Sequence, residues 1–376
     1  MLKRTIQGAR QNVTFFRCIM ASTNEPSLIK ESDIGKLYTV SSDVAAKLNF
    51  DKVLPSKYIR QLNTFSECSW LIREPFFEIL NKLSTVNKES SPLRFVLFGR
   101  FGTGKSITLY QLVHYAYTQK WTILNIKSVM DITRGSTETQ PSTKIKGKLD
   151  TQKHAIKALE LFKSQNQHVW DKLSELKTTK EYVWTKIDKT NAGKPITDIV
   201  EIGLSGAVSS TDCFGAFIEE LKHYSTSGEI KLFVAIDDAN SLYGKTNYKK
   251  VNGVYATPDD LSMVYYIKRL LDKDWKNGAV VMIADEKEVK DARDTLTIPL
   301  ATPLELFGED GYEDIVPFTG IQTRNYNDKE INVMYEYYKS KNWLMTPGAV
   351  TENGKNQLIY LSAFNPHYFE RLCAFV

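Results

Sequence analysis

The sequence predicts an α/β fold: a parallel sheet with a helical insertion and a mainly helical, lid-like C-terminal domain. Two observations carry this prediction. Short apolar runs recur along the chain with helical patterns between them, and a glycine-rich turn joins the first run to an amphipathic stretch. Such alternation is typical of parallel strands covered by helices on both faces of a sheet.

Four runs are the predicted strands. Each is apolar throughout rather than alternating, as strands buried on both faces are. They occupy residues 94–98, 121–126, 231–237 and 279–284. Between the second and third strands lies a long polar insertion, in which 133–148 predicts a flexible basic loop and 154–177 predicts a helix.

The chain divides into four segments. Residues 1–22 form a basic leader, 23–90 an extension that wraps a larger domain, 91–295 the domain of the sheet, and 296–376 the helical C-terminal domain. In the extension only 70–83 has a convincing helical period. In the C-terminal domain a single short strand-like run precedes the helices, the last of which we expect to begin at Asn365-Pro366, with Asn as its cap.

The leader carries Lys3, Arg4, Arg10 and Arg17 and no acidic residue, and these account for most of the net charge of +5. A basic disordered tail is one interpretation. We favour a mitochondrial transit peptide, because apolar residues recur roughly on one helical face between the basic ones. No apolar run approaches the ~20 residues that a membrane span requires. The four scattered cysteines suit a reducing compartment rather than a disulfide framework or a zinc site.

The glycine-rich turn predicts a phosphate-binding loop. Gly99, Gly104, Lys105 and Ser106 fit the pattern G-x-x-x-x-G-K-[ST], with an apolar strand before it and an amphipathic helix after it. Backbone amides and the helix N-terminus would face the phosphates, and Lys105 would bridge the outer ones. The predicted nucleotide-binding residues are Gly99, Arg100, Phe101, Gly102, Thr103, Gly104, Lys105, Ser106 and Ile107. The alternative is a vestigial loop that binds nothing.

A second element supports nucleotide binding. Asp237 ends an apolar strand downstream, where P-loop proteins place the carboxylate that holds Mg²⁺, and the Ser106 hydroxyl would complete the metal site. Residues 91–295 therefore predict a P-loop NTPase domain, AAA-like in its order of elements. AAA-like ATPases have Glu after that Asp, whereas Asp238 stands here. Asp238 is either a poor base or a group that positions the loop, and we name no arginine finger. We expect slow or no hydrolysis.

The segment Trp184–Asp188 contains Thr-Lys-x-Asp, the guanine-reading pattern of small GTPases. In those proteins it follows a strand beyond the metal aspartate. Here it precedes Asp237 by about fifty residues and lies beside a predicted helix. A salt-bridged helix terminus is therefore the favoured interpretation of Asp188.

With these motifs, the chain resembles the death-associated protein family, the P-loop protein of the mitochondrial ribosome's small subunit. The matching stretches are "FGRFGTGKS", "EYVWTKID", "FVAIDDANSLYGKT", "DKDWKNGAVV", "NYNDKEINVMYEYYKSKNWL" and "NPHYFERLCAFV". They run in order from the first strand to the C-terminus, whereas residues 1–90 match little. The pair Asp237-Asp238 departs from the family, whose second residue is more usually small.

The resemblance implies a component of the small subunit's head in the mitochondrial matrix. It would bind GTP or GDP with Mg²⁺, ATP remaining open, and contact ribosomal RNA and proteins. It also implies an association with apoptosis in animals. No DNA partner is implied. The candidate RNA contacts are two basic loops: Lys144, Lys146, Lys148 and Lys153, and then Lys245, Lys249 and Lys250, which are interleaved with Tyr243 and Tyr248.

Three functions compete on this evidence. The first is a ribosomal structural protein that keeps a nucleotide as a folding and docking element. The second is an NTPase that cycles during ribosome assembly. The third is a signalling NTPase whose lid closes over nucleotide to recruit partners. We favour the first, because no water-activating group stronger than Asp238 is present.

Overall fold

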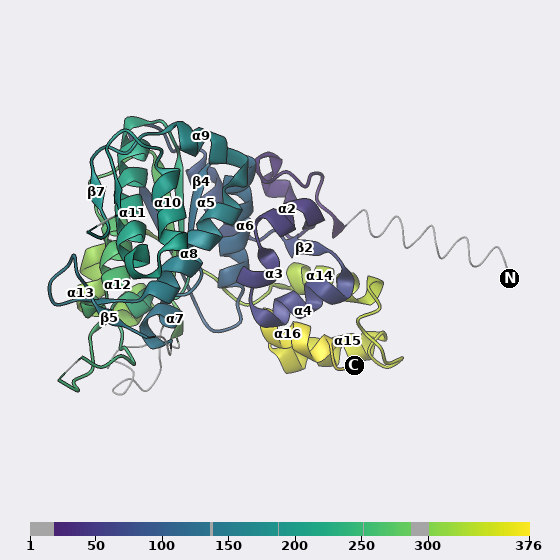
Figure 1. Ribbon diagram of the computed structural model, residues 1–376. Helices are drawn as coiled ribbons and strands as arrows, with labels where there is room; N and C mark the ends of the chain where they lie inside the picture. Colours follow the sequence, from purple (N-terminus) through teal and green to yellow (C-terminus); the bar gives the residue numbers. More distant parts are fainter. Residues whose placement is uncertain (1–18, 136–137, 187, 251, 287–300) are drawn as a thin grey trace.

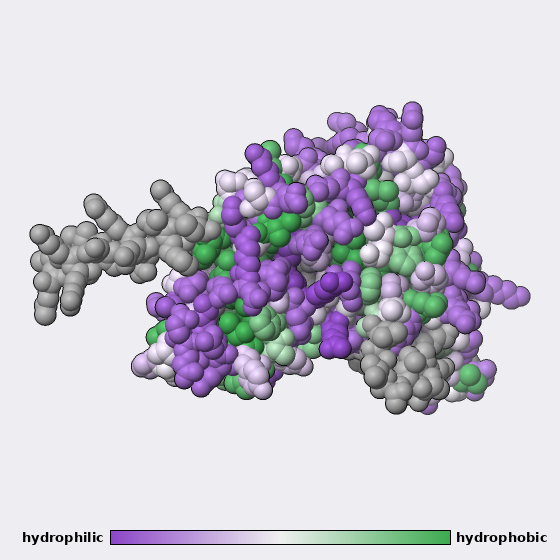
Figure 2. Space-filling view, turned by 180° about the vertical axis from the view of Figure 1, so that it is seen from behind, coloured by the Kyte–Doolittle hydropathy of each residue, from purple (hydrophilic) through white to green (hydrophobic). Residues whose placement is uncertain are grey.

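The computed structural model describes residues 19–135, 138–186, 188–250, 252–286 and 301–376. Most of the predicted transit peptide, residues 1–18, therefore lies outside the described residues, and so does the predicted boundary between 295 and 296. Within the described ranges, no helix combines the length and the apolar character that a membrane crossing needs. The face seen in Figure 2 is largely hydrophilic, with small hydrophobic patches between the polar groups.

A parallel sheet of five strands, counted over the described residues, forms the centre of the molecule. Its order is β11–β3–β10–β9–β4, and each neighbouring pair is parallel. The strands are β3 (Leu93–Phe98), β4 (Thr122–Ile126), β9 (Leu232–Ile236), β10 (Gly278–Ile283) and β11 (Thr319–Gln322). The four predicted strands are confirmed, each within one residue at either end. The fifth, β11, comes from the segment that the sequence assigns to the C-terminal domain.

Helices cover both faces of the sheet (Figure 1). Val234 and Ile236 of β9 belong to a core cluster with the helices of one face, whereas Phe233 and Ala235 belong to a second cluster with those of the other. The first face carries α8 (Gln152–Gln165), α10 (Thr197–Ser205), α11 (Ser210–Ser227), α12 (Ser262–Lys268) and α13 (Pro303–Ile315). The second carries α5 (Glu74–Leu83) and α6 (Lys105–Thr118). Because alternate residues are buried on opposite sides, β9 and β10 carry no polar side chain at any position.

The N-terminal extension adds a small layer outside α6. Strands β1 (Leu37–Val40) and β2 (Cys68–Leu71) pair antiparallel, and three helices lie between them in sequence: α2 (Ser42–Lys47), α3 (Phe50–Val53) and α4 (Ser56–Phe65). Tyr38 of β1 stacks on His114 of α6, with ring centroids 5.9 Å apart. The core of the extension is thus continuous with the face of the sheet that α6 covers.

The insertion between β4 and β9 is mostly helical, as predicted, but the single helix expected over 154–177 is wrong. It breaks at Asn166 into α8, the 3₁₀ helix η3 (Gln167–Val169) and α9 (Trp170–Glu175). The Asn166 side chain accepts from the Ile123 amide and donates to the Ile123 carbonyl, both at 2.7 Å. Ile123 lies on β4, the edge strand, so Asn166 satisfies backbone groups that no neighbouring strand pairs.

The remaining elements of the insertion are short. Helix α7 (Val129–Arg134) follows β4, and two small hairpins pair β5 (Gln140–Pro141) with β6 (Leu149–Asp150) and β7 (Tyr182–Val183) with β8 (Lys189–Thr190). Short 3₁₀ helices occur along the rest of the described chain: η1 (Pro26–Leu28), η2 (Glu31–Asp33), η4 (Ala207–Ser209), η5 (Ala239–Leu242), η6 (Pro258–Asp260) and η7 (Arg269–Leu271).

After β11 the chain forms α14 (Asp328–Ser340), α15 (Glu352–Ser362) and α16 (Pro366–Cys373). These helices lie beside the N-terminal extension (Figure 1), and Leu37 and Leu71 of that extension share a core cluster with them. Asn365 accepts from the amides of His367 and Tyr368, which confirms the predicted cap of the last helix. The extension and the C-terminal helices, distant in sequence, therefore meet at one end of the sheet.

Candidate nucleotide-binding site

The glycine-rich turn leaves the sheet at the end of β3 and enters α6. Gly99 and Gly102 have φ angles of 136° and 80°, a region that favours glycine. A Cβ atom at Gly99 would lie 2.3 Å from the Thr323 carbonyl oxygen, and one at Gly102 would lie 2.6 Å from Asn365 Oδ1. The outer side of the loop is therefore packed against the C-terminal segment too closely for any larger residue.

Lys105 opens α6 and is buried, with 5% of its surface exposed. Its ammonium donates to the carbonyl oxygens of Gly99 at 2.8 Å and Arg100 at 3.1 Å. The side chain therefore lies back along the loop, where its charge faces the turn. A buried ammonium held by carbonyls favours an anion beside it, because a buried cation is stabilised by a nearby opposite charge.

Ser106 and Asp237 meet although 131 residues separate them. The Ser106 hydroxyl donates to Asp237 Oδ2 at 3.0 Å. Asp237 directly follows β9, so the carboxyl end of that strand brings its side chain to the start of α6. Burial raises the pKa of Asp237 to about 7, and the charges of Asp238 and Asp285 contribute to that rise. A divalent cation would counter this repulsion.

The hydroxyl and carboxylate oxygens are donors that Mg²⁺ prefers, so this pair fits the metal that the sequence implies. Within the described ranges, no group of three or more His, Cys, Asp or Glu residues is placed to hold a metal ion. A cation held by Ser106 and Asp237 would therefore need further oxygens from phosphate or water, which is the usual mode of Mg²⁺ binding.

Asp238 takes a different position from its neighbour. Its backbone is left-handed, with φ of 54°, and its carboxylate accepts from the Ser128 hydroxyl at 2.5 Å. Ser128 is the N-cap of α7 and accepts from the Asp131 amide. The contact ties the turn after β9 to the start of α7, which is the loop-positioning role that the sequence left open.

Arg73 holds the loop from the N-terminal side. Its guanidinium forms an ion pair with Glu330 of α14 at 2.9 Å and donates to the Thr103 carbonyl at 2.8 Å. It also donates to the carbonyls of Arg324 and Asn325. One side chain from before β3 thus connects the glycine-rich loop to the C-terminal helices.

The first turn of α16 holds the same loop from the other side. Asn365 donates to the Phe101 carbonyl at 2.9 Å, and the His367 amide donates to the Gly102 carbonyl at 3.1 Å. The rings of Phe101 and His367 contact edge to face, with centroids 5.1 Å apart. The C-terminal segment therefore contacts the loop directly, through backbone groups as well as side chains.

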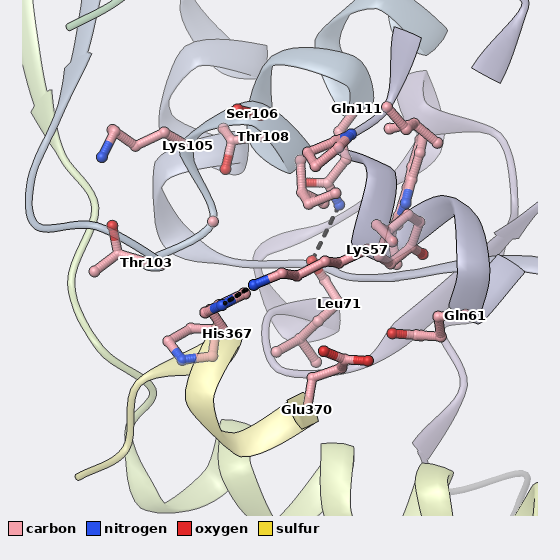
Figure 3. Close-up of a pocket in the computed structure, with 18 of the residues that line it drawn as sticks. Lys57, Gln61, Leu71, Thr103, Lys105, Ser106, Thr108, Gln111, His367 and Glu370 are labelled. Carbon is pink, nitrogen blue, oxygen red and sulfur yellow. Dashed lines mark hydrogen bonds between the residues drawn. The ribbon is translucent and has the colours of Figure 1, made fainter. Parts of the chain in front are cut away.

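A cavity of about 670 Å³ lies between these elements, within the usual size of a small-molecule site. The predicted residues that line it are Phe101, Gly102, Thr103, Gly104, Lys105, Ser106, Ile107 and Asp237. Gly99 and Arg100 do not line it; their carbonyls bind Lys105 instead. Figure 3 shows Thr103, Lys105 and Ser106 along one side of the cavity.

The opposite side comes from residues that sequence reasoning missed. Lys57 and Gln61 of α4 and His367 and Glu370 of α16 line it, and Lys57 Nζ lies 3.1 Å from His367 Nε2 (Figure 3). The N-cap of α16 is visible in the sequence, but no local pattern shows that α16 and α4 face the same cavity. Their proximity follows from the packing of the two ends of the chain.

The Thr-Lys-x-Asp segment neither follows a strand beyond Asp237, as in small GTPases, nor ends a helix. It forms the turn between β7 and β8, where Thr185 donates to the Asp188 carboxylate at 3.0 Å. The interpretation of a helix terminus is therefore wrong, because the segment closes a short hairpin. Asp188 is exposed and does not line the cavity.

The basic loops are partly engaged within the protein. Lys148 donates to the Asp259 carbonyl at 2.5 Å, and Lys250 forms an ion pair with Asp260 at 2.8 Å. Tyr243 and Tyr248 are only 8% and 7% exposed. The two rings interleaved with the lysines in the sequence are therefore too buried to stack on RNA bases. Both rings belong to the core on one face of the sheet.

Comparisons with known proteins agree with the resemblance. Residues 70–372 match the family described as "Mitochondrial ribosomal death-associated protein 3". A Bos taurus protein named "Small ribosomal subunit protein mS29" is 33% identical over 355 residues, which cover 94% of this chain and 87% of that protein. The Mus musculus protein of the same name is 33% identical over 353 residues, which cover 94% of this chain and 88% of that protein.

More distant similarities also occur. A Neurospora crassa protein of the same name is 23% identical over 256 residues, covering 68% of this chain and 52% of that protein. The solved structure titled "Structure of E. coli MS115-1 HORMA:CdnC:Trip13 complex" aligns at a TM-score of 0.30 with 9% identity, covering 87% of this chain and 80% of that chain. A similarity this low carries no argument. Because the mammalian matches cover 94% of the chain, they extend into residues 1–90 further than the sequence analysis expects.

Proposed function

Because the chain belongs to the mitochondrial ribosomal death-associated protein 3 family, we propose that it is a structural component of the mitochondrial small ribosomal subunit that holds GTP or GDP. In this role it supports mitochondrial translation from the matrix, bound to ribosomal proteins and to small-subunit RNA. The names of the mammalian relatives support the ribosomal assignment. The exposed lysines of its basic loops are the natural RNA contacts.

The observation that best supports nucleotide binding is the meeting of four features at one end of a cavity large enough for a small molecule. They are the glycine-rich loop, Lys105, the Ser106 hydroxyl and the Asp237 carboxylate. The amides of 102–106 and the N-terminus of α6 would bind the phosphates, with Lys105 beside them. Ser106 and Asp237 would hold Mg²⁺. When bound, the metal would neutralise phosphate charge. The Phe101 amide already donates to Glu286 at 3.3 Å, so it is not needed for the phosphates.

The residues around the cavity favour nucleotide holding over nucleotide hydrolysis. Asp238, the candidate base, is engaged by Ser128 at 2.5 Å. Among the described residues that line the cavity, the one arginine is Arg73, whose guanidinium binds Glu330 and three backbone carbonyls. Hydrolysis needs a group that orients water and a charge that stabilises the transition state. Neither role is easily assigned to these two residues.

Our proposal of an AAA-like fold rests on the order of the strands. In the sheet, β10 separates the loop strand β3 from β9, the strand that precedes Asp237. The helical segment after β11 contacts the loop from outside, as a lid would. These two features support the AAA-like assignment that the sequence predicts.

Lys105→Ala tests the proposal in the purified full-length protein. With GDP and Mg²⁺ at a hundredfold excess over Kd, the wild type should gain about 2.7 kcal/mol of stability, a rise of several degrees in Tm. Lys105→Ala should show no rise. The control Lys82→Ala removes an exposed lysine of α5 and should keep the full rise. An equal rise in Lys105→Ala, or none in the wild type, would contradict nucleotide holding.

A further inference from the structure

A second cluster of polar side chains is buried where three segments of the chain meet, away from the cavity. Asp150 ends β6, Asp212 lies in the first turn of α11, and Ser262 opens α12. A bridge between Leu149 and Leu261 sets the end of β6 beside the start of α12, and α11 packs against both α8 and α12 (Figure 1). None of these residues lines the cavity.

Several oxygen atoms of this cluster are buried without hydrogen bonds. Asp150 and Asp212 are only 3% and 6% exposed, and Ser262 is fully buried. Over the stretches of chain that the structure describes, Oδ1 of each aspartate and the Ser262 hydroxyl have no hydrogen-bond partner. The same holds for the buried hydroxyls of Thr151 and Thr211, which adjoin the two aspartates in sequence. Because buried polar atoms are nearly always satisfied, these five oxygens indicate a ligand that supplies what the chain does not.

The two carboxylates act on one another electrostatically. Burial raises the pKa of Asp212 to about 6, and the charge of Asp150 contributes to that rise while Lys144 opposes it. Burial also raises the pKa of Asp150, against the effect of the nearby Ser262 hydroxyl. The Lys144 ammonium donates to the Val183 carbonyl at 2.6 Å rather than to either carboxylate. Two neighbouring buried carboxylates of this kind are stabilised by a positive charge between them.

The chemistry of the cluster indicates which cation it suits. Every unsatisfied atom in it is an oxygen, and two ionised carboxylates balance one hard divalent cation. Mg²⁺ keeps several of its waters and is seldom held by protein oxygens alone, whereas Ca²⁺ accepts roughly six to eight oxygens in flexible geometry. A buried set of carboxylates and hydroxyls from three segments therefore favours Ca²⁺.

We propose that Asp150, Asp212 and Ser262 form a Ca²⁺ site that joins the helical insertion to α11 and α12. The two carboxylates bind the ion, and the Ser262 hydroxyl adds a further oxygen. Asp150 closes the hairpin of β5 and β6, whose loop, 142–148, carries three lysines of the first basic loop. The ion therefore also fixes the base of that loop. The site shares no residue with the glycine-rich loop or Asp237, so it stands independently of nucleotide holding.

The test is thermal unfolding of the full-length protein, stripped of metal with EDTA and dialysed, without nucleotide and with CaCl₂ added. KCl is present throughout, so that a site for a monovalent cation is already filled. At about a hundredfold excess of Ca²⁺ over Kd, the Tm of the wild type should rise by a few degrees, because the ion binds only the folded form. Mg²⁺ at the same concentration should raise the Tm less.

Asp150→Asn and Asp212→Asn should each abolish the Ca²⁺-dependent rise in Tm. Without Ca²⁺, both variants should be at least as stable as the wild type, because each removes the repulsion between two buried carboxylates. A purely structural role of these side chains would instead lower the Tm. Asp171→Asn removes an exposed carboxylate from the first turn of α9 and is the matched control, which should keep the full rise. Asp237→Asn should also keep it.

Tb³⁺, which replaces Ca²⁺ at oxygen sites, gives a second measurement. Burial and the charges of Asp212 and Asp150 raise the pKa of Tyr266, so this tyrosine of α12 lies near both carboxylates. Its ring should sensitise the luminescence of bound Tb³⁺, and Ca²⁺ should displace that signal. Tyr266→Phe should weaken the signal and keep the Ca²⁺-dependent rise in Tm. No rise in the wild type, an undiminished rise in Asp212→Asn, or an equal rise with Mg²⁺ would overturn the Ca²⁺ site.

Discussion

Two adjacent carboxylates show how backbone conformation assigns different roles to identical residues. Asp237 continues the extended line of β9 and reaches Ser106, whereas Asp238 turns into the left-handed region and reaches Ser128. The left-handed backbone at Asp238 ends the extended run of β9, so the two carboxylates reach different partners. The pair therefore combines the carboxylate that we propose for Mg²⁺ with one contact that fixes the turn.

Asp238→Asn separates holding from hydrolysis at the level of one residue. The variant keeps a carbonyl oxygen for the Ser128 hydroxyl and removes the charge that repels Asp237. We expect nucleotide occupancy and incorporation into small subunits to stay within about twofold of the wild type, because neither needs a base. Both are measured on subunits purified from cells that express the variant. Subunit assembly that stalls while nucleotide stays bound would instead indicate a hydrolytic cycle.

At the scale of elements, α16 is the clearest link between the C-terminal helices and the glycine-rich loop. Its N-cap, Asn365, performs two tasks: its Oδ1 caps the helix, and its Nδ2 binds the Phe101 carbonyl. Sequence alone predicts the cap, because Asn followed by Pro is a strong start signal. It does not predict the second contact, which depends on the position of a loop 264 residues earlier in the chain.

Asn365→Ala and Thr351→Ala form a matched pair of cap deletions. Thr351 caps α15 by accepting from the Gly354 amide, and no described contact joins it to the loop. Each change should cost about 1 kcal/mol of stability in urea unfolding, the typical value of a lost cap. Only Asn365→Ala should also weaken GDP binding, several-fold by calorimetry. Equal nucleotide affinity in the two variants would show that α16 does not support the loop.

Other elements differ in how far the sequence alone predicts them. The central strands are predictable because buried parallel strands are apolar at every position. Strand β11 is not predictable as a member of the sheet, because its four residues include Gly320 and carry no continuous apolar run. The break at Asn166 is hidden because the apolar period continues across it, while the competing contact is to an edge strand 43 residues earlier.

At the scale of the whole molecule, the site joins segments from both ends of the chain. The loop and Asp237 follow from local patterns and are predictable. The opposite end of the cavity is not, because Gln61 and Glu370, which line it, lie 309 residues apart and each resembles an ordinary polar residue of a surface helix. A ligand that bridges such segments stabilises only the folded arrangement, by an amount that grows with its concentration over Kd. For a ribosomal protein, that stabilisation would hold the chain in the conformation that binds the ribosomal subunit.

The most direct test is to isolate the protein from mitochondria without added nucleotide, wash it at high salt, and identify what copurifies. We expect it to sediment with the small ribosomal subunit and to carry close to one guanine nucleotide per chain. On incubation with Mg²⁺ the ratio of GTP to GDP should stay constant over hours. A protein that leaves the subunit, carries no nucleotide, or steadily converts GTP to GDP would contradict a structural component that holds its nucleotide.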